Sequence, residues 1–412
     1  MHSVSRDGLA VAMASSWQPI QGGVTASEGF QAAGIVAGLK PSGKPDLALL
    51  LAPEAAVCAG TFTTSVVRAA CVDLCRDRLS SNGGQVRAVL INSGQANACT
   101  GDRGLVDSQR ATQVLADQLG LDAESVLICS TGVIGVPIPM TTLLAGLAPL
   151  VETLDDEGGD AAANAILTTD LVDKQVALEL ELEGRLVRIG GMAKGSGMIH
   201  PDMATMLGFF SCDAGVDAAV WQGMVQRAVQ RSFNAITVDG DTSTNDTVLA
   251  FAAGPPLAQE HHVVLEQGLT QAMQQLAQAI ARDGEGATCL IEVQVEGAVD
   301  EAAALLVART VCGSSLVKTA VHGRDPNWGR IVAAAGRSGV SFEPGAVALW
   351  IGPHQLMAAG QPVAFDRAAA SDILRQEHVP IRVCLGDGSG CGQAWGCDLS
   401  DQYVRINADY TT

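Results

Sequence analysis

The sequence is poor in aromatic residues and in basic residues. Aromatic side chains make up 4% of its 412 residues, and 25 Lys and Arg stand against 44 Asp and Glu, for a formal net charge of −19. Proteins bind nucleic acid largely through Lys and Arg that neutralise phosphates, so this composition argues against a nucleic-acid partner. A strongly acidic chain stays dispersed in solution, and we expect a cytoplasmic protein.

Long hydrophobic runs are also missing. A membrane-spanning helix needs about 18 or more apolar residues in succession, and no run in the sequence approaches that length. The short apolar patch over residues 9–14 is smaller than the apolar core of about 7–15 residues in a signal peptide. We therefore expect neither a membrane span nor a signal peptide.

The cysteines and histidines show no metal-binding spacing. The eleven cysteines include no Cys-x-x-Cys pair, and most have apolar neighbours, as Cys384 has. Such residues are typical of buried free thiols in a reducing compartment. No two of the seven histidines are spaced as His-x-x-x-His, and His261 and His262 are adjacent. We expect no structural or catalytic metal and no organic cofactor.

The chain is rich in small apolar residues and in glycine, a composition that suits an α/β enzyme. Hydrophobic residues make up 48% of it, and 46 residues are glycine. The predicted strands cover residues 47–51, 88–91, 126–129 and a hairpin of 176–182 with 186–189. The predicted helices cover residues 107–119, 217–231, 261–282 and 367–376. At the C-terminal end, short strands over residues 381–385, 393–397 and 403–406 predict an antiparallel meander.

The predicted domain boundary lies where the long helix ends, near Asp283. A strand-first segment begins shortly after this point. We therefore expect a first domain over residues 1–283 and a smaller C-terminal α/β domain over residues 284–412.

Two glycine-rich segments look like phosphate-binding loops but are better explained as turns. In residues 38–45, Pro45 stands where such a loop has a metal-binding hydroxyl, and Pro41 removes an amide from the cradle. Residues 386–392 lack a complete Gly-x-Gly-x-x-Gly and are predicted to form a hairpin loop. The sequence also has no Gly-x-Ser-x-Gly, which argues against an α/β-hydrolase.

The segment over residues 192–207 contains the most informative pattern in the sequence. Gly, Ser, His and Pro crowd into a turn that ends at Ala204 and Thr205, just before a new apolar run. A strained turn before a threonine is what a self-activating N-terminal nucleophile requires. The hydroxyl attacks the preceding carbonyl, and the freed α-amine then serves as its base. On this segment alone, a glycine-rich surface loop is the simpler interpretation.

Six blocks of the sequence, in order, resemble the ornithine acetyltransferases, also called the bifunctional glutamate N-acetyltransferases of arginine biosynthesis. The blocks are residues 92–101, 130–135, 168–170, 192–207, 284–288 and 405–410. The resemblance runs from residue 22 to residue 412. It implies a layered α/β sandwich related to the self-processing aminopeptidases, with a smaller C-terminal α/β domain.

The resemblance also implies an activity and a processing step. The chain would cleave itself between Ala204 and Thr205 into chains 1–204 and 205–412, assembled as a heterotetramer of two α and two β chains. Thr205 would take the acetyl group from N-acetylornithine and pass it to glutamate in a ping-pong cycle. Whether acetyl-CoA also serves as donor stays open.

Individual residues take their expected roles from this resemblance. Thr131 and Gly132 would form the oxyanion hole, although Thr-Gly turns after strands are common. Lys194 would hold a substrate α-carboxylate and Glu285 a side-chain ammonium, although each alone is more often a solvated or structural charge. The remaining substrate-binding residues implied by the resemblance are Thr168, Asn407 and Thr412, the last two in a polar tail that would otherwise be expected to fray.

Three further blocks and two departures from the family's usual residues do not change this assignment. The acidic block 239–246 lacks calcium-ligand spacing and is expected to be a structural loop near the nucleophile, as block 322–330 is expected to be structural. Block 92–101 is expected to support the oxyanion region. Asp202 stands where the family usually has Asn, and Cys289 stands where it usually has Lys. The only question raised by Asp202 is whether it changes the rate of self-cleavage.

Two other functions remain open from the sequence. One is a self-processed amidohydrolase or aminopeptidase, in which water accepts the acyl group. The other is a binding protein without enzymatic activity, which would keep an uncleaved chain.

Overall fold

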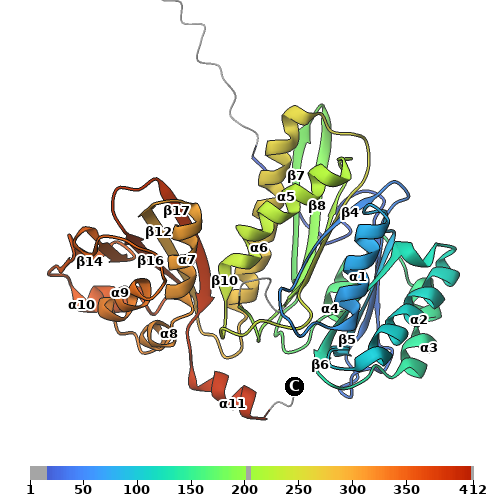
Figure 1. Cartoon of the computed structure of the whole chain (residues 1–412), viewed down its shortest axis with the longest axis horizontal. Helices are drawn as coiled ribbons and strands as arrows, with labels where there is room; N and C mark the ends of the chain where they lie inside the picture. The colour runs from blue at the N-terminus through green and yellow to red at the C-terminus, as the bar shows by residue number, and fades with distance from the viewer. Residues whose placement is uncertain (1–15, 201–205, 410–412) are drawn as a thin grey trace, which may run out of the picture.

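Residues 16–200 and 206–409 are described by the computed structural model, which contains three β-sheets covered by helices (Figure 1). The first sheet has the order β1 (Gln18–Pro19), β7 (Lys174–Leu182), β8 (Arg185–Lys194), β9 (Leu207–Cys212), β11 (Thr247–Ala252) and β4 (Val57–Phe62). The second has the order β2 (Gln31–Ile35), β3 (Leu47–Leu51), β5 (Ala88–Gln95) and β6 (Val126–Val133).

The third sheet belongs to the C-terminal part of the chain. Its order is β10 (Ile236–Thr237), β17 (Gly390–Cys397), β12 (Leu290–Ala298), β16 (His378–Cys384), β13 (Ala348–Ile351), β14 (His354–Ala358) and β15 (Gln361–Pro362). The described helices are α1 (Ala70–Ser81), α2 (Gly101–Leu119), α3 (Met140–Glu152), α4 (Gly159–Ala165), α5 (Ala218–Gln230), α6 (His262–Arg282), α7 (Glu301–Cys312), α8 (Ser315–His322), α9 (Trp328–Gly336), α10 (Arg367–Ile373) and α11 (Asp401–Asp409).

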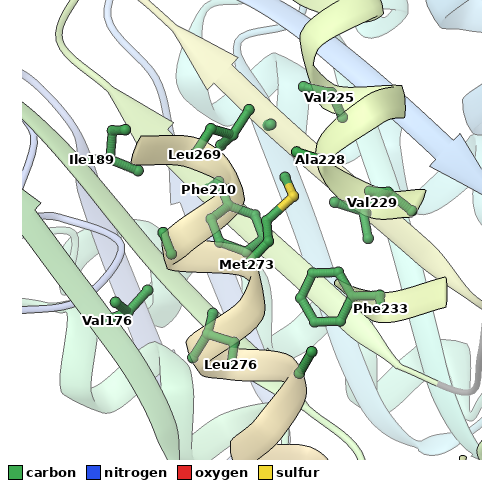
Figure 2. Packing of buried hydrophobic residues seen from close by; sticks show 14 of the residues in the cluster. Val176, Ile189, Phe210, Val225, Ala228, Val229, Phe233, Leu269, Met273 and Leu276 are labelled. Carbon is green, nitrogen blue, oxygen red and sulfur yellow. The ribbon is translucent and has the colours of Figure 1, made fainter. Parts of the chain in front are cut away.

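The first two sheets pack face to face between two layers of helices. Successive side chains of a strand point to opposite faces, so Phe209 faces the four-stranded sheet while Phe210 faces α5 and α6. Figure 2 shows Phe210 against Met273 of α6, with Phe233 beside them. The outer face of the four-stranded sheet packs on α1, α2 and α3. The predicted layered α/β sandwich is confirmed.

The predicted hairpin is present, but its second strand is longer than expected. Strand β8 continues through the glycines at 190 and 191 to Lys194, which pairs with Leu207 of β9. Strand β6 likewise runs to Val133 and includes Thr131 and Gly132. Both strands extend past the apolar run because a neighbouring strand pairs with their polar ends.

The C-terminal meander predicted from the sequence is wrong. Strand β12 lies between β16 and β17, parallel to the first and antiparallel to the second. The hairpin loop predicted over residues 386–392 is therefore also wrong: residues 385–389 connect two strands that are not neighbours, and residues 390–392 already belong to β17. The predicted strand over residues 403–406 is part of helix α11, where an Arg405–Asp401 ion pair spans one turn. The helix predicted over 367–376 ends at Ile373, and the helix predicted from residue 107 already begins at Gly101.

The thiols are mostly buried, as the sequence predicted. Eight of the eleven cysteines are buried and none is in a disulfide, whereas Cys99 and Cys391 are exposed.

We keep the domain boundary near Asp283 as a proposal. The third sheet gains its short strand β10 from before this boundary.

Candidate active site

One pocket gathers residues from both sides of the 201–205 segment. It lies where the ends of β6 and β8 meet three loops and helix α11. The residues that line it are Ala96, Thr131, Gly132, Ile134, Thr168, Thr169, Lys194, Gly197, Met198, Ser243, Thr244, Asn245, Glu285 and Asn407. Six of the predicted site residues are in this set: Thr131, Gly132, Thr168, Lys194, Glu285 and Asn407. Ala204, Thr205 and Thr412 lie outside the described residues.

Gly132 occupies a position that requires glycine. It pairs with Gly94 of the parallel strand β5, and the two have φ angles of +128° and +129°. L-residues rarely adopt this conformation. A Cβ on Gly132 would also lie 2.3 Å from the carbonyl carbon of Gly94. The ends of β5 and β6 therefore approach each other through backbone atoms alone, where Gly132 lines the pocket.

Buried amide side chains fix the strand ends that carry Thr131 and Gly132. The Asn245 Nδ2 donates to the carbonyl oxygens of Ala96 and Ser130 at 2.6 and 2.8 Å. The Ser130 hydroxyl donates to the Asn92 Oδ1 at 2.6 Å. Since buried carbonyls without a donor are costly, these bonds hold Thr131 in one place. Two residues of block 92–101, Asn92 and Ala96, accept these bonds.

Lys194 is a buried cation at the edge of the pocket. Lys194 is only 4% exposed, and its Nζ lies 3.5 Å from the Thr168 hydroxyl. Burial lowers the pKa of Lys194, while the negative charge of Asp170 opposes this shift. The negative charges of Asp246 and Glu285 also act on Lys194.

Asp170 organises the surroundings of Lys194. One carboxylate oxygen accepts from the Gly195 amide at 2.6 Å and from the Lys174 Nζ at 2.8 Å, and the other accepts from the Thr168 amide at 3.0 Å. Burial raises the pKa of Asp170, but Lys174 and Lys194 outweigh it and lower the pKa to about 2. Lys174 also donates to Asp283 at 2.7 Å.

Helix α11 brings Asn407 to the pocket, where its Nδ2 donates to the Glu285 Oε2 at 2.8 Å. Glu285 is buried, and its amide donates to the Ser196 carbonyl at 3.0 Å. A Cβ on Gly197 would lie 2.5 Å from the Glu285 carboxylate, so a larger residue at position 197 would displace this carboxylate from its present place. Asn407 is the part of the C-terminal tail that lines this pocket.

Carboxylates of the acidic block hold the chain on both sides of residues 201–205. Asp239 accepts from the amides of Met198 and Ile199 at 2.6 and 2.9 Å. Asp246 accepts from the Met206 amide at 3.1 Å, and burial raises its pKa well above the ordinary range. The acidic block is thus a structural loop, as predicted.

Two negative findings apply to the described part of the chain. Over residues 16–200 and 206–409, no three His, Cys, Asp or Glu side chains gather closely enough to hold a metal ion. Within the same ranges no single helix is long and apolar enough to span a membrane, and α7 with α8 reaches the necessary length and composition only as a bent pair.

Sequence reasoning included three residues in its blocks without giving any of them a role of its own: Asp170, Asn245 and Asp246. Asn245 bonds to a carbonyl 115 positions away, and no local pattern reveals such a partner. Asp170 stands two positions after Thr168 in one of the six blocks, and its place in that block was the available signal.

The comparisons with known proteins identify the family of the chain. A model of the ArgJ family matches residues 31–412. The protein named arginine biosynthesis bifunctional protein ArgJ from Parasynechococcus marenigrum is 79% identical over 98% of this chain and 99% of its own length. The protein of the same name from Prochlorococcus marinus is 72% identical over 100% of this chain and 98% of its own length.

A solved structure is also similar in sequence. It is described as ornithine acetyltransferase complexed with ornithine, from Mycobacterium tuberculosis, with 43% identity and a TM-score of 0.42 over 45% of this chain and 98% of that chain. The family model and the curated relatives each cover almost the whole chain. The chain therefore belongs to the ArgJ family, the family that its six sequence blocks resemble.

Proposed function

We propose that this protein transfers the acetyl group of N-acetylornithine to glutamate through an ester on Thr205, within arginine biosynthesis. Membership of the ArgJ family supports the acetyl transfer. One observation carries the choice of site: the six described residues that the motifs selected, drawn from positions 131 to 407, line a single pocket.

The proposed first half-reaction forms the acetyl ester. The Thr205 hydroxyl gives its proton to the α-amine of the same residue and attacks the acetyl carbonyl. The Thr131 hydroxyl and the Gly132 amide donate to the resulting oxyanion. When the amide C–N bond breaks, the proton passes to the departing amine, and ornithine leaves.

The second half-reaction returns the enzyme to its starting state. The amine of glutamate attacks the ester, the same donors hold the oxyanion, and the Thr205 oxygen leaves with a proton. Neither half-reaction requires a metal or an organic cofactor. The route needs a closed pocket, because water would otherwise hydrolyse the ester.

Charge separation in the pocket supports the assignment of substrate-binding residues. Lys194 would hold the α-carboxylate, with the Thr168 hydroxyl beside it. Glu285 would attract the side-chain ammonium of ornithine. The hydrogen bond from Asn407 orients the Glu285 carboxylate for this contact. Thr412 completes the proposed set from the end of the tail.

Self-cleavage between Ala204 and Thr205 would create the nucleophile. The Thr205 hydroxyl attacks the Ala204 carbonyl, and the C–N bond between the two residues breaks, which frees the α-amine of Thr205 and leaves an ester. Water then hydrolyses this ester and releases the Thr205 hydroxyl and the Ala204 carboxylate. The antiparallel pairing of Lys194 with Leu207, and the bond from the Met206 amide to Asp246, support a turn that is held at both ends. The products would be chains 1–204 and 205–412 in a heterotetramer.

One assay separates this function from its alternative. Purified enzyme is given N-acetylornithine with and without glutamate, and both N-acetylglutamate and acetate are measured. Formation of N-acetylglutamate at a rate far above acetate release supports acetyl transfer. Acetate released equally fast without glutamate would point to a self-processed amidohydrolase, and absence of both products would reject the proposal.

A further inference from the structure

One carboxylate oxygen in the interior of the protein has no hydrogen-bond partner among the described residues. Asp246 is fully buried, and its Oδ1 accepts from the Met206 amide at 3.1 Å. Its Oδ2 is equally shielded from water, yet none of the residues over 16–200 and 206–409 donates a hydrogen bond to it. A buried acceptor without a donor costs free energy, so this oxygen calls for a partner.

The place of Asp246 in the fold shows which groups surround this oxygen. Asp246 directly precedes β11, whose first residue pairs with Leu207 of β9 on one side and with Phe62 of β4 on the other. Both of these side chains are apolar, and the Thr63 amide beyond β4 donates to the Asp246 carbonyl at 2.9 Å. From β8, the positive charge of Lys194 acts on the carboxylate.

Covalent geometry puts one further nitrogen within reach of this oxygen. Consecutive backbone nitrogens lie roughly 3 Å apart, and the two oxygens of a carboxylate lie about 2 Å apart, as standard bond lengths require. A carboxylate that accepts from one amide can therefore accept from the preceding nitrogen through its second oxygen. For Asp246, the preceding nitrogen belongs to Thr205, because Thr205 comes directly before Met206.

Asp239 shows the same arrangement on the other side of residues 201–205. Its Oδ2 accepts from the Met198 amide at 2.6 Å, and its Oδ1 accepts from the next amide, that of Ile199, at 2.9 Å. Asp239 thus uses both oxygens on consecutive nitrogens, whereas Asp246 uses one and leaves the other free. The nitrogen of Thr205 would complete the second pair.

Building on the proposed function, we propose that Asp246 positions the α-amine of Thr205 in the cleaved enzyme, with its Oδ2 accepting a hydrogen bond from that amine. One N–H of the amine then points at Asp246, so the nitrogen lone pair is left to face the Thr205 hydroxyl. Asp246 does not line the amino-acid pocket. It acts through the base and not on the substrate.

The carboxylate also stabilises the charge that forms on the amine during the reaction. The amine becomes an ammonium when it takes the hydroxyl proton, and an adjacent carboxylate favours that charge. The proton then passes to the departing amine of ornithine, so Asp246 is unchanged over the cycle. Burial raises the pKa of Asp246 well above its ordinary range, whereas the Met206 amide and Lys194 oppose this shift. A cationic partner at Oδ2 opposes it further.

The test compares Asp246→Asn with Asp239→Asn. In Asp246→Asn the side-chain oxygen still accepts from the Met206 amide, but an NH2 group replaces the free oxygen, so only the acceptor for the amine is lost. Asp239→Asn changes the matching carboxylate before residues 201–205. Chains 1–204 and 205–412 are co-expressed, and removal of the initiator methionine exposes Thr205, so that no variant depends on self-cleavage.

The expected result is a slower enzyme with a shifted pH profile. In Asp246→Asn, kcat/KM for N-acetylornithine should fall about tenfold or more, because the base is no longer held in place. The acidic limb of the pH profile should move to lower pH, since an ammonium without its carboxylate loses its proton more readily. The acidic limb of Asp239→Asn should stay at the wild-type position.

Reaction of the amine with cyanate gives a readout that needs no catalysis. Cyanate carbamoylates amines in their neutral form, and chain 205–412 has one lysine, Lys318, which is 3% exposed. Mass spectrometry of this chain therefore reports on the α-amine of Thr205. The pH at which carbamoylation begins should be lower in Asp246→Asn than in wild type or Asp239→Asn.

Two results would overturn the proposal. One is a carbamoylation profile of Asp246→Asn that matches the wild-type profile, because a carboxylate that only ties the Met206 amide leaves the pKa of the amine unchanged. The other is an equal shift in Asp239→Asn, which would reflect the charge of the acidic block and not a contact with the amine. Wild-type enzyme that transfers no acetyl group would instead reject the proposed function itself.

Discussion

At the scale of single residues, the site depends on buried charges that compensate one another. Asp170 has the central place, since it bonds to Lys174 and to the amides of Thr168 and Gly195. Replacing it by Asn should cost about 3 kcal/mol at pH 7, because breaking a buried ion pair leaves a charge without its partner. Urea unfolding measures this, with the exposed neighbour Asp173→Asn as the control that should change little.

The Asp170 ion pair also predicts a pH dependence. The folded pKa of Asp170 is about 2, below its ordinary 3.8, so its ionisation stabilises the fold above pH 4. That stabilisation, roughly 2 kcal/mol, is lost as the pH falls from about 4 to about 2. The difference in unfolding free energy between wild type and Asp170→Asn should therefore shrink over this range. A difference that stays constant from pH 7 to pH 3 would contradict the assigned role.

Asn245 should matter for catalysis because it positions the strand end that carries Thr131. Asn245→Ala removes the donors to the carbonyls of Ala96 and Ser130, and the strand end with Thr131 can then shift. We expect kcat to fall about 10- to 100-fold, since small misplacements of a catalytic group are costly. Asn245→Asp, which keeps the size but loses the donors, should behave like Asn245→Ala. Wild-type kcat in both variants would exclude this positioning role.

At the scale of elements, α11 is held to the protein by polar contacts. None of its described residues is buried, and Asn407 reaches Glu285 from its last turn. Removing residues 407–412 should cost little stability, because little apolar surface is lost, but should raise the KM for N-acetylornithine. Val404→Ala, at a side chain that is 64% exposed, is the control. An unchanged KM in the truncated enzyme would contradict the role of the tail.

The local sequence pattern predicted elements well where apolar alternation was strong. The hairpin of β7 and β8 was visible because Val176, Leu178, Leu180 and Leu182 alternate. Where strands continue through polar residues, as at Thr131 and Lys194, the pattern failed, because a paired neighbour rather than apolar burial extends them. The segment over 403–406 has β-favouring residues but no neighbouring strand, so it forms a helix.

The residues of the candidate site could be predicted from the sequence motifs, but not from the pattern of apolar and polar residues. Thr131, Lys194 and Glu285 were selected through blocks of sequence, and the structure places them around one pocket. The roles of Asp170 and Asn245 were missed because they arise from partners that only the folded chain brings together.

At the scale of the whole molecule, the first sheet joins the two halves of the chain. Strand β9 follows the proposed cleavage site and pairs with β8 before it, while β11 pairs with β4 from the first half. We therefore expect the purified protein to contain chains 1–204 and 205–412 that stay associated. N-terminal sequencing should find Thr205, Thr205→Ala should give one uncleaved chain, and any other new N-terminus would contradict the proposed processing.

The acetyl ester on Thr205 is the central claim, and intact-mass spectrometry tests it most directly. Enzyme is mixed rapidly with N-acetylornithine in the absence of glutamate and quenched in acid. We expect one acetyl group on the chain that begins at Thr205, and parallel lines in double-reciprocal plots of the full reaction. An acetyl group on neither chain, together with intersecting lines, would contradict the ester and establish direct transfer between the two substrates.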